Sequence, residues 1–145
     1  MDAQSLDNLT RVLQASIAPV ALVSGVGLLI LSQTNRLGRV MDRLRHVLDQ
    51  RRALNTADAH LDRQVAVLHR RARILRGAVS TAVLCVLLAS VLVLVLFTAA
   101  AFGANLGTLI IGLFSASLLS LIISLVLFIF DMNLSLKALQ EELLR

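Results

Sequence analysis

The sequence predicts an all-α membrane protein with three transmembrane helices and a cytoplasmic antiparallel helical hairpin, a coiled coil, between the first and the second. The chain of 145 residues is 57% hydrophobic, with a mean hydropathy of +0.82. This apolar content exceeds the 45–50% that is typical of soluble domains. Three apolar runs are each long enough to cross a bilayer, which takes about 20 residues. Between the first two runs lies an arginine-rich stretch whose apolar residues recur with heptad-like spacing.

The three expected transmembrane helices are residues 17–34, 77–102 and 106–130. Apart from Cys85, none of them contains an ionisable side chain. Only residues 103–105 separate the second run from the third, so these two helices are expected to form an antiparallel hairpin across the membrane.

Two shorter segments flank the spans. Residues 1–16 are expected to form an N-terminal interfacial segment, and residues 131–145 a cytoplasmic C-terminal helix. Pro19 either begins the first membrane helix or kinks it, because proline lacks the backbone N–H of a helix interior.

The charge distribution predicts the orientation. The net charge is +5, and residues 36–76 alone carry eleven arginines against four aspartates. Short arginine-rich loops stay in the cytoplasm. Residues 35–76 and the C-terminus are therefore expected inside, and the N-terminus outside.

Residues 35–76 are predicted to form two helical arms joined by a turn at residues 55–60. Folding the two apolar stripes about that turn gives one register. The pairs it predicts are Leu54 with Leu61, Val47 with Leu68, Val40 with Leu75, and an ion pair of Asp42 with Arg73.

The chain resembles a family of bacterial membrane proteins known as domain of unknown function 2721. The residues that carry the resemblance are Ile17-Ala18-Pro19-Val20, Ser24-Gly25-Val26-Gly27, Thr34-Asn35-Arg36-Leu37-Gly38-Arg39-Val40-Met41-Asp42-Arg43 and Arg70-Arg71-Ala72-Arg73-Ile74-Leu75. The resemblance implies a three-span protein of the bacterial inner membrane. It implies no activity and no functional residues.

Seven arginines flank the predicted spans on the cytoplasmic side and are candidate contacts for anionic lipid. They are Arg36, Arg39, Arg43, Arg70, Arg71, Arg73 and Arg76. Each such residue near an anionic surface contributes about 1 kcal/mol. The same residues would also act simply as a topology signal on a solvated helix face. No aromatic residues are interleaved with them, which argues against nucleic acid as a partner.

Small residues recur along the third span and are candidates for a helix-packing face or a pore lining. They are Thr108, Gly112, Ala116, Ser120 and Ser124. Small residues allow close helix packing, whereas hydroxyl groups also suit a narrow polar pore. A second small-residue stripe, in the second span, is expected to fit a partner helix; it consists of Ala78, Ala82, Cys85 and Ala89.

His46 and His69 fall opposite each other in the predicted hairpin register, with Asp42 and Asp49 one turn from His46. Such a group would bind a metal or titrate near neutral pH, but solvated surface histidines have the same pattern. The sequence leaves these alternatives open. We predict no metal, no cofactor and no catalytic residues, since the hydroxyls in the spans have no activating base beside them.

The leading functional hypothesis is a non-enzymatic, homo-oligomeric membrane protein whose basic hairpin contacts anionic lipid or a partner. The alternative is a homo-oligomeric, anion-favouring ion channel. Its pore would be lined by small and hydroxyl residues of a transmembrane helix, and the arginines would lie at its cytoplasmic mouth. Neither the number of subunits nor a transported species follows from the sequence.

Overall fold

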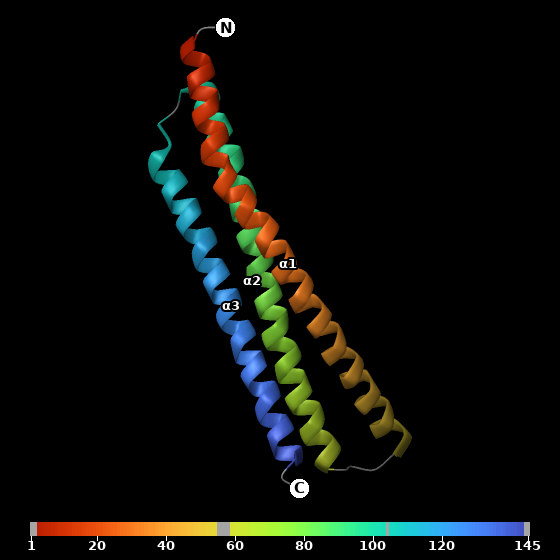
Figure 1. Ribbon diagram of the computed structural model, residues 1–145. Helices are drawn as coiled ribbons and strands as arrows, with labels where there is room; N and C mark the ends of the chain where they lie inside the picture. The colour runs from red at the N-terminus through yellow and green to blue at the C-terminus, as the bar shows by residue number, and fades with distance from the viewer. Residues whose placement is uncertain (1–2, 55–58, 104, 144–145) are drawn as a thin grey trace. The chain divides into compact units, whose positions relative to one another are not determined.

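The computed structural model is all-helical, with three long helices in the order α1 (Ala3–Leu54), α2 (Ala59–Phe102) and α3 (Gly107–Leu143) (Figure 1). The structure describes residues 3–54, 59–103 and 105–143, without the side chains of residues 3–9, 12, 54, 59–60 and 136–143. All three helices are long and apolar enough to cross a membrane. The chain therefore has the architecture of a multi-pass membrane protein.

The first two helices are longer than the spans inside them. α1 has 52 residues and α2 has 44, so each expected hairpin arm continues a membrane span as one helix. α1 begins at Ala3 and passes through Pro19 without interruption. The expectation that Pro19 begins the helix is therefore wrong. The missing proline N–H leaves a single helical bond unmade, and the rest of the helix continues on either side.

The turn between α2 and α3 lies where the sequence predicts it. α2 ends at Phe102, and Gly103 follows with a φ of 62°. Glycine adopts this left-handed conformation without the penalty of a Cβ, which makes it the usual residue after a helix end. The turn predicted at residues 55–60 falls mostly on 55–58, which lie outside the described residues, as does the side chain of Leu54.

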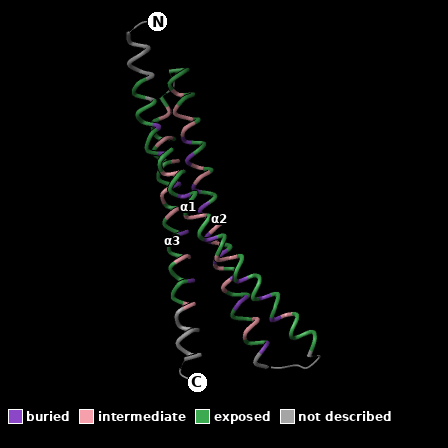
Figure 2. The backbone as a smooth tube through the Cα atoms, turned by 45° about the vertical axis from the view of Figure 1, so that its right-hand side comes forward, coloured by how far each residue is buried: buried purple, intermediate pink, exposed green. Residues whose placement is uncertain are grey.

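The chain divides into two compact units, each built from a part of every helix. Unit 1 consists of Met1–Ile30 with Thr81–Ile122, and unit 2 consists of Leu31–Ser80 with Ile123–Arg145. Buried residues recur along the helices between exposed ones, as Figure 2 shows.

Unit 1 has a small core and closely packed helices. Val26 of α1 packs with Ala82 and Cys85 of α2. Ser120 of α3 donates a hydrogen bond of 2.7 Å to the carbonyl oxygen of Thr81. The side chains at this contact are small, which lets α3 approach the α2 backbone closely enough for this bond.

Unit 2 contains the two apolar stripes of the predicted hairpin. They form one buried cluster, consisting of Val40, Leu44, Val47, Leu61, Leu68, Ala72 and Leu75. Phe128 of α3 packs against this cluster. The two stripes thus pack in one cluster, to which a third helix also contributes.

One finer expectation about the hairpin is wrong. Asp42 and Arg73 do not form an ion pair; both are exposed, and Arg73 Nη2 lies 3.4 Å from Nε2 of His69. The ion pair that does join the arms links Arg51 and Asp62, 3.0 Å apart and about half exposed. An exposed ion pair contributes little free energy. The register set by apolar packing therefore does not determine which charged residues pair.

Candidate anion site in unit 2

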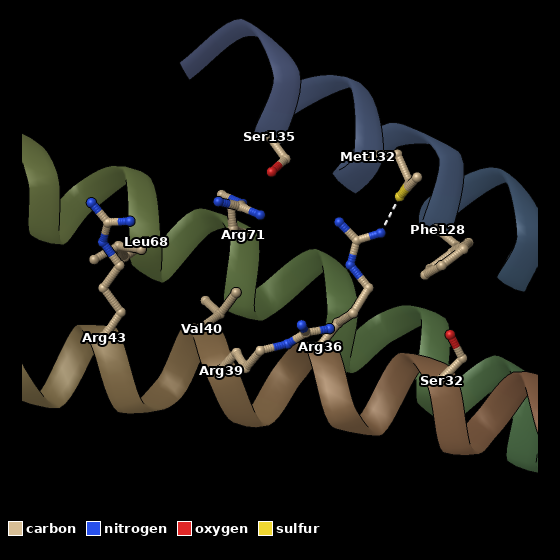
Figure 3. Close-up of a pocket in the computed structure, with 10 residues that line it drawn as sticks. All are labelled: Ser32, Arg36, Arg39, Val40, Arg43, Leu68, Arg71, Phe128, Met132 and Ser135. Atoms are coloured by element: carbon tan, nitrogen blue, oxygen red, sulfur yellow. Dashed lines mark hydrogen bonds between the residues drawn. The ribbon is translucent and has the colours of Figure 1, made fainter. Parts of the chain in front are cut away.

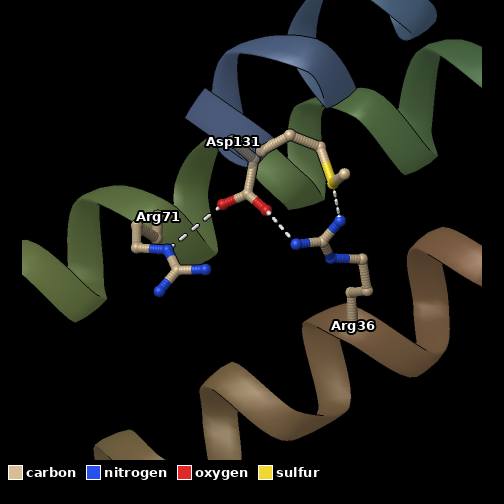
Figure 4. Close-up of polar contacts among 4 residues, drawn as sticks. Arg36, Arg71 and Asp131 are labelled. Carbon is tan, nitrogen blue, oxygen red and sulfur yellow. Dashed lines mark hydrogen bonds and ion pairs between the residues drawn. The ribbon is translucent and has the colours of Figure 1, made fainter. Parts of the chain in front are cut away.

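A buried carboxylate lies at the centre of unit 2. Asp131 of α3 is 0% exposed and lies between Arg36 of α1 and Arg71 of α2 (Figure 4). Arg71 donates from Nε to Oδ1 at 3.3 Å. Nη2 of Arg36 is 3.8 Å from Oδ2, an ion-pair distance too long for a hydrogen bond. One carboxylate thus interacts with two guanidinium groups from two other helices.

Arg36 has further contacts that hold its side chain in place. Its guanidinium carbon lies 5.4 Å from the centroid of the Phe128 ring, within cation–π range. Nη1 also contacts the sulfur of Met132. The Arg36 side chain is 22% exposed and that of Arg71 16%, so both reach solvent while being anchored on α3.

A second polar contact joins the three helices in the same unit. Gln33 of α1 is 0% exposed and donates from Nε2 to Oγ of Ser124 at 3.1 Å. Ser124 in turn donates to the carbonyl oxygen of Ala78 at 2.8 Å. Oε1 of Gln33 has no hydrogen-bond partner among the described residues. These bonds satisfy most of the polar atoms that the apolar surroundings enclose.

Beside Asp131, residues of the three helices line an open groove of about 590 Å³. We call it the basic groove (Figure 3); its lining residues are Ser32, Arg36, Arg39, Val40, Arg43, Leu68, Arg71, Phe128, Met132 and Ser135. Four arginines line it, and none of its lining residues among those that the structure describes is acidic. The groove therefore has donors and positive charge on an apolar wall, which is the chemistry of an anion site.

The structure separates the seven candidate arginines into two groups. Arg36, Arg39, Arg43 and Arg71 line the basic groove. Arg70, Arg73 and Arg76 are exposed and lie outside it. Arg36, Arg39 and Arg43 share one face of α1, because residues three and four apart in a helix lie side by side, and Arg71 comes from α2.

The candidate face of the third span is also divided. Ser120 and Ser124 are buried, and their hydroxyls donate to carbonyl oxygens of α2. Thr108, Gly112 and Ala116 are exposed and line a shallow apolar groove with Leu109 and Leu113. All four residues of the second small-residue stripe are fully buried; they are Ala78, Ala82, Cys85 and Ala89.

His46 and His69 each interact with a residue of their own helix and not with each other. Nε2 of His46 lies 3.2 Å from Nε2 of Gln50, on its own helix, and His69 interacts with Arg73. In the described part of the chain, no group of three or more histidine, cysteine, aspartate or glutamate side chains is arranged to hold a metal ion.

Asp131 and Gln33 are the two site residues that sequence reasoning missed. Asp131 is the first residue after the third predicted span, and Gln33 lies near the end of the first. One signal was present, because Asp131 is the only acidic residue between Asp62 and Glu141 and it follows an apolar run directly. An isolated carboxylate at that position needs a cationic partner when it is buried.

The chain matches the family described as Protein of unknown function (DUF2721) over residues 16–141. Because the match covers most of the sequence, the chain belongs to this family. Comparisons with curated proteins and with solved structures gave no match.

Proposed function

We propose that this protein is a non-enzymatic, homo-oligomeric protein of the bacterial inner membrane whose basic hairpin contacts anionic lipid on the cytoplasmic side. The observation that carries the proposal is the basic groove. Its arginines lie near the apolar runs in the sequence, since Arg36 follows the first run and Arg71 precedes the second. Such positions lie at the depth of lipid headgroups.

The charge balance supports the orientation with the hairpin inside. Juxtamembrane arginines keep a short loop in the cytoplasm and are attracted to anionic lipids of that leaflet. In this orientation the N-terminus and Asn105 are outside and the C-terminus is inside. The same residues thus serve both insertion and lipid contact.

The polar groups of the spans support a role without catalysis. Ser90 and Thr98 donate to carbonyl oxygens one turn earlier in their own helix, and Ser120 and Ser124 donate to α2. A hydroxyl that donates to a carbonyl oxygen is not activated for catalysis, because a nucleophilic hydroxyl gives its proton to an adjacent general base.

The shallow groove on α3 supports self-association. Thr108, Gly112 and Ala116 form an exposed strip without large side chains, beside Leu109 and Leu113. Helices associate in membranes through such strips because they allow close backbone approach.

The same strip is the observation that favours a second candidate, an anion-favouring channel formed by several copies. Thr108 is exposed and offers a hydroxyl to a pore, whereas Ser120 and Ser124 are occupied in the contact with α2. Ion flux in vesicles that contain the purified protein, reduced by Thr108→Val, would support this candidate. Absence of any flux would contradict it.

Lipid retention tests the lipid-contact proposal. The full chain is placed in nanodiscs of phosphatidylglycerol and phosphatidylcholine mixed in equal amounts, and retained lipids are identified by native mass spectrometry. We expect phosphatidylglycerol to be enriched among them, and the enrichment to fall with added salt. Equal retention of the two lipids at low salt would contradict the proposal.

A further inference from the structure

We propose that the basic groove is a binding site for a phosphomonoester group, which is a narrower statement about the anionic ligand of the proposed function and rests on it. The groove presents more than a charged surface. Its arginines extend from two helices, and Asp131 lies behind them as a buried counter-charge.

The hydrogen-bond donors all line the basic groove. Arg36, Arg39 and Arg43 recur at intervals of three and four on α1, and Arg71 faces them from α2 (Figure 3). Ser135 adds a hydroxyl from α3. Each guanidinium is a planar fork of five N–H donors that suits the oxygens of a phosphate.

Asp131 orients two of the four arginines without cancelling the positive charge of the groove. The carboxylate of Asp131 pairs with both Arg36 and Arg71, so one negative charge is set against two positive charges. Arg39 makes no hydrogen bond and no ion pair with any described residue. Asp131 is a positioning residue in this arrangement, and Arg39 is a direct contact to the ligand.

The apolar wall strengthens these contacts. Val40, Leu68 and Phe128 line the groove beside the arginines. Apolar walls exclude water on one side, so charge-assisted hydrogen bonds formed there are stronger than on an open surface.

The count of donors favours a phosphomonoester over a diester. A phosphomonoester has a charge of about −1.5 to −2 near neutral pH and three terminal oxygens. A phosphodiester has one charge and two free oxygens. Four guanidinium groups line the groove and Asp131 is the counter-charge to two of them, and this excess of positive charge matches the larger charge of the monoester. Two sources supply this group, a lipid such as phosphatidic acid and a soluble phosphate compound.

The test compares headgroups with identical acyl chains. Nanodiscs that hold the full chain contain phosphatidic acid, phosphatidylglycerol and phosphatidylcholine in equal amounts, and retained lipid is measured by native mass spectrometry. A parallel arm adds inorganic phosphate or glycerol 3-phosphate to phosphatidylcholine nanodiscs and measures the thermal shift. We expect phosphatidic acid to be retained at least about fivefold over phosphatidylglycerol.

Paired variants locate the site. Arg39→Gln with Arg43→Gln removes two charges from the groove, and Arg45→Gln with Arg63→Gln removes two exposed charges elsewhere on the same arms. The preference for phosphatidic acid should vanish in the first variant and persist in the second. A groove-dependent thermal shift with soluble phosphate, without lipid preference, would support the same ligand chemistry from the soluble source.

The outcomes separate the two proposals. Equal retention of phosphatidic acid and phosphatidylglycerol, with no groove-dependent shift in the soluble arm, overturns the phosphomonoester site. It leaves the proposed function standing if both lipids exceed phosphatidylcholine. A preference that both paired variants preserve overturns the site as well, because binding would then lie outside the groove.

Discussion

At the scale of single residues, the sequence predicts where the positive charges gather but not what holds them. The helical spacing of Arg36, Arg39 and Arg43 is readable from the chain, so their shared face is predictable. The contact of Asp131 with Arg36 and Arg71 is not, because it joins residues of three helices that are 60 or more positions apart in the sequence. Only the packed register of α3 against the other two helices brings these groups together.

Replacement of Asp131 by leucine should destabilise the protein strongly. Two arginines would lose the carboxylate that anchors them, and breaking a buried ion pair costs on the order of 3 kcal/mol. Thermal unfolding of the variant in nanodiscs measures the loss. The matched control is Asp42→Leu, at an exposed position. An Asp131 variant as stable as the control would show that the buried contact contributes nothing.

Ser124 links the three helices through two hydrogen bonds, one accepted from Gln33 and one donated to Ala78. Ser124→Ala removes the donor to Ala78 and the acceptor for Gln33, which should cost about 1 kcal/mol. Ser90→Ala is its control, since that hydroxyl bonds only within its own helix. Equal unfolding temperatures of the two variants would contradict the assigned role of Ser124.

At the scale of elements, the spacing of apolar residues predicts which of them pack together. The spacing of charged residues predicts their ion pairs less well. The stripes that place Val40, Val47, Leu68 and Leu75 in one cluster follow from spacing alone. The Asp42–Arg73 pair expected from the same register does not form. Apolar burial constrains register strongly, whereas exposed charges choose partners among several near-equal options.

Leu75 provides the test of that cluster. It is 0% exposed, and Leu75→Ala should lower the free energy of unfolding by about 2–5 kcal/mol through lost burial and a cavity. Val67→Ala, at a position 42% exposed on the same helix, should cost much less. Similar losses for both variants would contradict the assignment of Leu75 to the core.

At the scale of the whole molecule, composition predicts the membrane architecture, and the length of the apolar runs predicts the number of spans. The division of the small-residue face was not predictable. A four-residue period assigns Gly112 and Ser124 to one stripe, but only the packing against α2 shows that Ser124 is covered and Gly112 exposed.

Self-association through that exposed strip is testable with a single variant. Gly112→Leu fills the shallow groove and should shift the protein toward the monomer in nanodiscs, as measured by native mass spectrometry. Ile111→Ala changes a neighbouring exposed residue and should leave the oligomer unchanged. An oligomer that persists in the Gly112 variant would exclude this strip as the interface.

The most direct test of the account as a whole is the side of the membrane on which the basic hairpin lies. Two variants are made in a Cys85→Ala background, one with Asn105→Cys and one with Arg63→Cys, and both positions are exposed. Each variant is labelled in intact bacterial spheroplasts with a membrane-impermeant maleimide. We expect Asn105→Cys to react at once and Arg63→Cys to react only after permeabilisation. The reverse pattern would place the arginines outside and contradict contact with the cytoplasmic leaflet.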